Sequence, residues 1–154
     1  MKNVFFIILI SFILIGCNQS ATSVFKKDPI YAQNLQYTKL IKVLNKDQEI
    51  EAIVNITYLN SVNSKKYNNN SQNFLVGIYK EDLNTTNYML TMNELLNVNI
   101  KAIDKDSVEY KNIAFKNNWA EYYIYTFVDL ETKVLTLKYF NPNVGKGSVS
   151  FEKE

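Results

Sequence analysis

Alternating apolar and polar positions dominate the chain after its N-terminal part. Every second residue from Ile50 to Tyr58 is apolar and most of those between are polar, a period of two that predicts a half-buried β-strand. Segment 74–79 is apolar on both faces and indicates a central strand, while 121–128 is rich in the aromatic and β-branched residues that fit a pleated surface. Further strands are predicted at 37–44, 88–92, 98–102, 133–140 and 148–151.

The segments between these strands carry turn signals. Residues 129–132 predict a hairpin connection between 121–128 and 133–140, and 143–147 is a glycine-containing turn. The polar stretch 61–73 is long for a hairpin loop, so it is either a mobile or binding loop or simply a solvated one that tolerates change. The region 31–44 is ambiguous and can begin as a short helix.

Seven or eight short strands without a long helical period indicate an antiparallel all-β fold. A two-sheet, immunoglobulin-like sandwich over residues 35–154 is the first expectation, and a small β-barrel is the alternative. The sequence lacks the Cys…Trp…Cys signature of immunoglobulin domains, so the first expectation depends on strand number and length alone.

The N-terminal segment has the composition of a signal peptide. Lys2 precedes an apolar run over residues 4–15, which is too short to span a membrane comfortably as a helix. The run ends in Leu14-Ile15-Gly16-Cys17, which resembles the lipobox of bacterial lipoproteins. Residues 1–16 are therefore expected to be a signal peptide that is removed.

The resemblance to bacterial lipoproteins implies how the protein is anchored. The Cys17 thiol would carry a diacylglycerol, a type II signal peptidase would cut between Gly16 and Cys17, and the acyl chains would bind the membrane. Residues 17–34 would be the lipidated cysteine and a flexible tether. Asn18 stands where an Asp resembles an inner-membrane retention signal in some bacteria, which favours the outer membrane, facing the periplasm or the cell exterior.

Composition narrows the chemistry. The 154 residues include no His, no Arg and one Cys, so the chain lacks the usual neutral-pH base, the commonest metal ligand and any internal disulfide. A formal net charge of +2 gives no reason to propose nucleic acid as a partner. No glycine-rich phosphate loop is present, and no cofactor is expected.

Carboxylates are the remaining catalytic candidates, but each pair lies at the end of a predicted strand, where acidic side chains usually stabilise turns. Ser64-Lys65 is a common local pair that nothing marks as a site. We therefore expect no enzyme and no metal site. The carboxylate pairs are Glu81 with Asp82, Asp104 with Asp106, and Asp129 with Glu131.

Clustered aromatic residues are the best indication of binding. Trp119, Tyr122, Tyr123 and Tyr125 are close in sequence, and Tyr123 and Tyr125 share one face of the predicted strand while Tyr122 lies on the other. One face must be core, and the other would expose rings to a sugar or a protein partner. The plainer interpretation is that tyrosines cover a sheet face with their hydroxyls in water, and that Trp119 plugs the end of the sandwich.

These patterns together predict a lipid-anchored, non-enzymatic binding or assembly module for another cell-envelope protein. A glycan- or peptidoglycan-binding module that uses exposed aromatic residues is the alternative, and a carboxylate-based hydrolase is disfavoured.

The anchor hypothesis makes a direct prediction. Replacement Cys17→Ser removes the thiol that would form the thioether, so the variant is expected to carry no lipid. Mass spectrometry of the purified protein measures the acyl mass. An unchanged acyl mass on the variant would show that Cys17 is not the lipidated residue.

Overall fold

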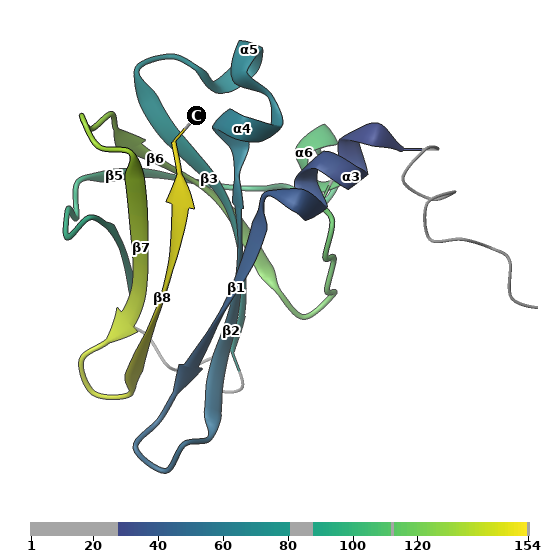
Figure 1. Cartoon of the computed structure of the whole chain (residues 1–154). Coiled ribbons are helices and arrows are strands. Elements are labelled where there is room, and N and C mark those ends of the chain that lie inside the picture. Colours follow the sequence, from purple (N-terminus) through teal and green to yellow (C-terminus); the bar gives the residue numbers. More distant parts are fainter. Residues whose placement is uncertain (1–27, 81–87, 112, 154) are drawn as a thin grey trace, which may run out of the picture.

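The computed structural model describes residues 28–80, 88–111 and 113–153, and within them it confirms the predicted all-β antiparallel fold. One eight-stranded sheet has the order β4-β7-β8-β1-β2-β3-β6-β5 (Figure 1). The strands are β1 Thr38–Leu44, β2 Ile50–Tyr58, β3 Ser71–Lys80, β4 Met89–Met92, β5 Val98–Ala102, β6 Glu121–Val128, β7 Val134–Asn141 and β8 Gly145–Glu152.

Four short helices accompany the sheet within the described ranges: α3 Pro29–Gln36, α4 Leu59–Val62, α5 Ser64–Tyr67 and α6 Val108–Lys111. Asp28 caps α3 by accepting a hydrogen bond from the Tyr31 amide at 2.9 Å, and Pro29 suits the first helical position. The expected boundary between tether and domain at residue 35 therefore falls inside α3. The signal peptide and Cys17 lie outside the described residues.

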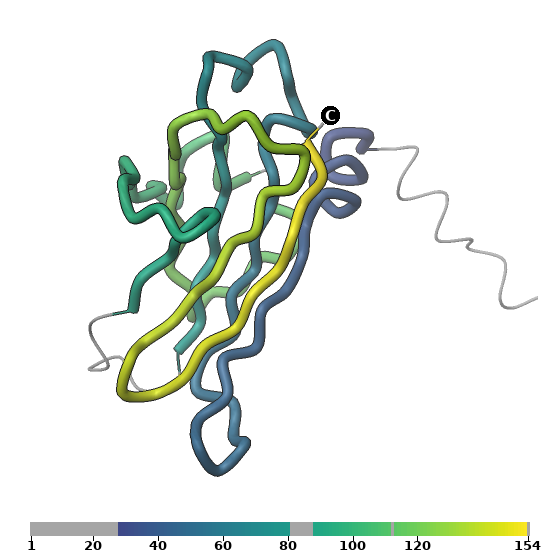
Figure 2. The backbone as a smooth tube through the Cα atoms, turned by 60° about the vertical axis from the view of Figure 1, so that its left-hand side comes forward, coloured from purple at the N-terminus to yellow at the C-terminus, as the bar shows by residue number. Residues whose placement is uncertain are grey.

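The sheet curls until its two ends face each other, as the hairpin of β7 and β8 in front of the other strands shows (Figure 2). A single buried cluster joins both ends: Leu135 and Leu137 of β7 pack with Val54 of β2 and Phe74 of β3. Because all eight strands belong to one nearly closed sheet, the immunoglobulin-like sandwich is not confirmed. The small barrel that was the alternative fits.

Two glycines allow β8 to approach β1 and so join the two halves of the sheet. A Cβ on Gly145 would clash with the Leu44 carbonyl oxygen, and one on Gly147 would clash with the Ile41 side chain. The two strands then separate, since Leu44 with Lys146 is their one register pair among the described residues. Lys39 crosses the gap: its ammonium donates to the Ser150 carbonyl at 2.5 Å and lies 5.2 Å from the centre of the Phe151 ring.

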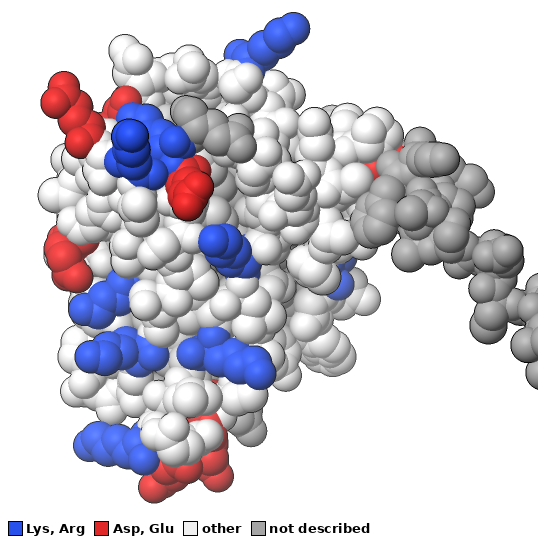
Figure 3. Space-filling model, viewed as in Figure 1, with Lys and Arg blue, Asp and Glu red and all other residues white. Residues whose placement is uncertain are grey.

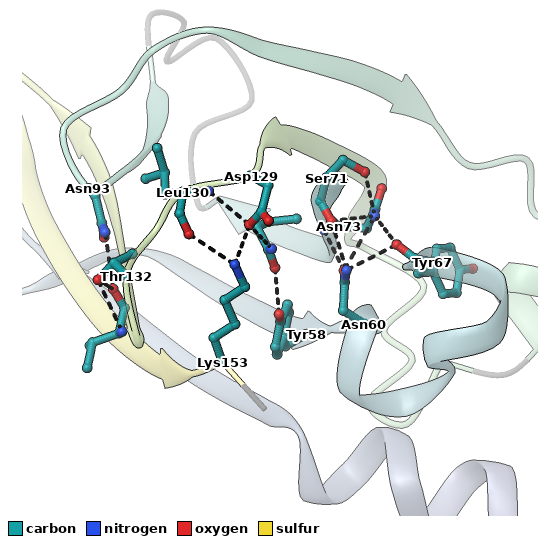
Figure 4. Close-up of polar contacts among 12 residues, drawn as sticks. Tyr58, Asn60, Tyr67, Ser71, Asn73, Asn93, Asp129, Leu130, Thr132 and Lys153 are labelled. Carbon is teal, nitrogen blue, oxygen red and sulfur yellow. Dashed lines mark hydrogen bonds and ion pairs between the residues drawn. The ribbon is translucent and has the colours of Figure 1, made fainter. Parts of the chain in front are cut away.

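The predicted hairpin between β6 and β7 is wrong. Strand β6 pairs with β3 and β5, and β7 pairs with β4 and β8, so residues 129–133 cross from one part of the sheet to another. Side chains hold this crossing, because the Asp129 carboxylate accepts from Gln72 and from Lys153, both at 2.6 Å (Figure 4). The Tyr58 hydroxyl donates to Gln72 at 2.5 Å and extends the network into the core.

The polar insertion after β2 is structured rather than open. It forms α4 and α5, and the Asn60 side chain fastens it to the start of β3 (Figure 4). The Asn60 amide group donates to the carbonyls of Ser71 at 2.8 Å and Tyr67 at 3.0 Å, and its oxygen accepts from the Asn73 backbone amide at 2.8 Å. The buried Asn73 side chain also donates to the Tyr67 carbonyl.

Substitution Gly145→Ala is expected to destabilise the protein by roughly 1–3 kcal/mol, because the new methyl group overlaps a backbone oxygen that cannot move aside freely. Urea unfolding of the variant and of wild type gives the change in free energy. Ser148→Ala, at an exposed position of the same strand, is the control and should shift the midpoint little. Equal midpoints for Gly145→Ala and wild type would contradict the role assigned to the glycine.

Candidate binding groove

Neither face of β6 presents a row of exposed aromatic rings. Tyr125 is 8% exposed and packs in the inner core with Phe127, while Tyr122 is 5% exposed and belongs to a second cluster on the outer face. Tyr123 is half-buried against the inner core. Of the four residues singled out by the sequence, Trp119 is the one that is largely in solvent.

The outer cluster consists of Leu59, Leu75, Ile113, Ala120 and Tyr122. It is covered by the long connection from β5 to β6, which includes α6. Gly77 of β3 makes room for the Tyr122 ring, since a Cβ there would lie 2.5 Å from a ring carbon of Tyr122. The Tyr110 ring from α6 meets the Tyr122 ring edge-on at 5.5 Å between centroids. This cluster forms the rigid base of the loop that carries Trp119.

Trp119 is 80% exposed, so the expectation that it plugs the end of the fold is wrong. It stands on a tight turn, in which the Asn117 side-chain oxygen accepts from the Trp119 amide at 2.9 Å. The Tyr122 hydroxyl also stabilises the turn. It accepts a hydrogen bond from the Asn117 amide at 2.7 Å and donates one to the Phe115 carbonyl at 3.1 Å. The exposed indole is therefore carried by a fixed backbone.

A groove of about 460 Å³ runs beside Trp119. Its lining combines apolar, aromatic and polar side chains. Three of the four sequence-predicted binding residues line it, and Tyr125 does not. The lining residues are the apolar Ala102, Ile103 and Ala120, the aromatic Tyr110, Trp119, Tyr122 and Tyr123, and three exposed polar residues that we call the polar rim, Lys105, Asn118 and Glu121.

The polar groups of the groove suit recognition rather than catalysis. The Tyr123 hydroxyl donates to the Glu121 carboxylate at 3.0 Å. Burial is the main reason that the pKa of Tyr123 is raised to about 12, and the hydrogen bond to Glu121 adds to the effect. The hydroxyl therefore stays protonated at neutral pH, and together with Lys105 it offers hydrogen bonds at the edge of the groove.

The free edge of β5 leads into this groove. The Ile103 amide donates to the Tyr122 carbonyl at 2.9 Å, and antiparallel pairs alternate, so Lys101 and Asn99 bond to β6 in turn. The amide and carbonyl groups of Ile100 and Ala102 then point away from β6, and no strand in the described part of the chain pairs with that edge. The Ile100 side chain is 50% exposed beside them.

A second pocket, of about 130 Å³, lies among α3, α4, α5 and α6. Leu59, Leu75 and Ile124 form apolar walls, and the ion pair of Lys66 with Glu109 at 2.9 Å lies at its margin. The hydrogen bond between them raises the pKa of Lys66 and lowers that of Glu109. Cavities of this size hold one benzene-sized apolar group, so the pocket accommodates a single side chain at most.

The remaining candidates have structural partners. Asp104 accepts from the Asp106 amide at 3.0 Å within a turn, and Asp129 is held by Lys153, while Glu81 and Asp82 lie outside the described residues. No group of three or more metal-binding side chains occurs in the described ranges. Among the helices of those same ranges, none has the length and apolar character needed to cross a membrane.

Comparison with known proteins gives no relative from which a role could be transferred. No family model, no curated protein and no solved structure matches the chain significantly.

Sequence reasoning missed the polar rim of the groove and the free edge of β5. The rim combines residues from two separate segments, which a linear pattern does not connect. One signal was available for Trp119, since Asn117-Asn118 immediately before it is a common turn sequence and turns lie at the surface.

Alkaline pH is expected to destabilise the fold through its buried tyrosines. Between the ordinary pKa of 10 and about 12, unfolded chains release the Tyr123 proton while folded ones keep it, so stability falls as pH rises. Replacement Tyr123→Phe should remove about 1 kcal/mol of that loss after allowance for solvent screening. Denaturant unfolding from pH 9 to pH 11.5 measures it, with Tyr79→Phe at an exposed site as control. If the free energy of unfolding of Tyr123→Phe falls with pH as steeply as that of wild type, Tyr123 is not the source of the loss.

Proposed function

We propose that this protein is a lipid-anchored cell-envelope module that binds a partner protein through the Trp119 groove and the adjoining edge of β5. The observation that carries the proposal is the 80% exposure of Trp119 on a turn fixed by Asn117 and Tyr122. A large apolar side chain held in water by a rigid backbone contributes little to the core, whereas tryptophan and tyrosine dominate the binding energy of protein interfaces.

The geometry of the edge supports a peptide-like ligand. An extended segment of the partner, laid against β5, would meet the outward amide and carbonyl groups of Ile100 and Ala102. Ala102 also lines the groove, so one side chain of the same segment could enter beside Trp119. Backbone hydrogen bonds would then supply affinity and the groove would supply specificity.

The lipid anchor is inferred from the sequence alone. Leu14-Ile15-Gly16-Cys17 supplies the lipidation motif, and ten residues separate Cys17 from Asp28, where the described domain begins. A lipid at this position would hold the module at a membrane of the envelope. The outer membrane is favoured by Asn18.

Glycan is the second candidate ligand, and the polar rim favours it. Lys105, Asn118 and Glu121 lie around the Trp119 indole within reach of sugar hydroxyls, while the indole face could stack on the apolar face of a sugar ring. The groove is thus chemically suited to one or two sugar units of a cell-wall polymer.

Replacement Trp119→Ala is expected to reduce in-cell crosslinking to the partner protein by tenfold or more, the loss typical of an interface hot spot. Crosslinking in intact cells, followed by quantitative mass spectrometry, measures it. Leu40→Ala, which shortens a 49% exposed side chain on β1, is the matched control and should leave the yield unchanged. The Cys17→Ser variant tests whether crosslinking to the partner requires the lipid anchor.

Undiminished capture of the same partner by Trp119→Ala would refute the protein-binding proposal. Sedimentation of the purified protein with cell-wall glycan, abolished by Trp119→Ala and not by Leu40→Ala, would support the glycan alternative in its place.

A further inference from the structure

Lysines gather on the outer face of the sheet at β1, β8 and β7. Two of them have core residues as their chain neighbours: Lys42 lies between Ile41 and Val43, and Lys138 lies between Leu137 and Tyr139. Side chains alternate along a strand, so Lys42 and Lys138 point outward. Figure 3 shows blue side chains spread over this part of the front of the molecule.

Strand register places these lysines next to one another. Lys146 of β8 lies opposite Leu44 of β1 and opposite Phe140 of β7. Lys42 and Lys138 are each two residues from those partners, so both are diagonal neighbours of Lys146, at about 7–8 Å between backbones. We call Lys42, Lys138 and Lys146 the lysine row. Its members are far apart in sequence, and the pairing of three strands assembles them.

Little acidic charge balances the row. Strands β1, β7 and β8 contain the row and Lys39 but a single acidic residue, Glu152, which lies at the far end of β8 from Lys146. Glu94 approaches Lys138 at 3.9 Å, but its side chain is 82% exposed and the pair is weak. Helices α3, α4 and α5 pack toward β2 and β3, and α6 packs against β6 through the rings of Tyr110 and Tyr122, so the described helices leave this face of the sheet bare (Figure 1).

We propose that the lysine row seats the domain on the anionic lipid headgroups of the membrane that holds its anchor. This inference rests on the proposed lipid at Cys17. The partner is identified by charge complementarity and by reach. The ten residues between Cys17 and Asp28 allow a distance of at most about 40 Å, so the domain stays close to the lipid headgroups. Lys26 and Lys27 add positive charge to that tether.

Seating in this orientation has a consequence for the groove. The lysine row lies on the outer face of β1, β8 and β7, whereas Trp119 precedes β6, which β1, β2 and β3 separate from β8 in the strand order. With the row against the bilayer, the groove and the edge of β5 face away from the membrane, toward a partner.

The test uses the full-length, processed protein in vesicles of phosphatidylcholine alone or with one third phosphatidylglycerol. A water-soluble amine reagent labels lysines, and mass spectrometry reads the rate at each one. We expect labelling of Lys42, Lys138 and Lys146 to be at least fivefold slower on anionic vesicles. Lys65 and Lys101, exposed on other surfaces, should react equally on both. About 1 M salt, which shortens the screening length to about 3 Å, should abolish the difference.

A triple variant, Lys42→Gln with Lys138→Gln and Lys146→Gln, provides a second readout. Digestion of the domain by a soluble protease after Lys46, which is exposed in the turn between β1 and β2, should become as fast on anionic as on neutral vesicles. The matched triple variant Lys65→Gln with Lys101→Gln and Lys116→Gln should keep the wild-type difference.

The two hypotheses fail in different ways. Equal labelling of the lysine row on both vesicle types, with the protein floating on both, would overturn the seating proposal and leave the anchor intact. If the protein does not float with neutral vesicles, the proposed lipid at Cys17 is refuted. Protection by a soluble acidic protein at the same charge density, but not by anionic vesicles, would assign the row to a protein ligand and overturn the membrane proposal.

Discussion

The joining of the two halves of the sheet depends on how closely the backbones of β1 and β8 can approach each other. Only hydrogen fits on Cα at Gly145 and Gly147, because a methyl group would overlap the Leu44 oxygen or the Ile41 side chain. That approach carries β7 and β4 over the rest of the sheet. The inner cluster then combines Leu135 and Leu137 from one end of the sheet with residues of β2, β3 and β6 from the other. Without it, each part would expose an apolar face.

A second layer on the outer face creates the groove. Strand β3 is buried along almost its whole length, and β6 contributes Tyr122 outward and Tyr125 inward. The connection between β5 and β6, with α6 and the Asn117 turn, covers only part of this outward face. The groove lies where the cover ends. Tyr122 has two roles there: its ring is packed in the cluster and its hydroxyl fixes the turn that presents Trp119. The proposed binding surface is thus built on a buried side chain.

Strand positions followed from the sequence because period-two patterns such as Ile50 to Tyr58 report local burial directly. The topology did not follow, because the sequence between β6 and β7 has the composition of a hairpin turn whether or not the strands pair. Strand β7 instead pairs with β4 and β8 and buries Leu135 and Leu137 in the inner core, and the Asp129 carboxylate holds the crossing through Gln72 and Lys153, residues that are remote in sequence. The same holds for the site. Aromatic clustering identified Trp119, Tyr122 and Tyr123, but the rim and the lysine row arise from register between distant strands.

Pairing of β1 with β8 also constrains the order of events when the chain is made. Leu44 pairs with Lys146, so this edge of β1 stays unpaired until the chain as far as Lys146 has left the ribosome or crossed the membrane. Contacts so far apart in sequence close slowly, and an unpaired edge is a template for association with other chains. The fold is therefore completed by its last strand, and its most vulnerable stage is the interval before that strand arrives.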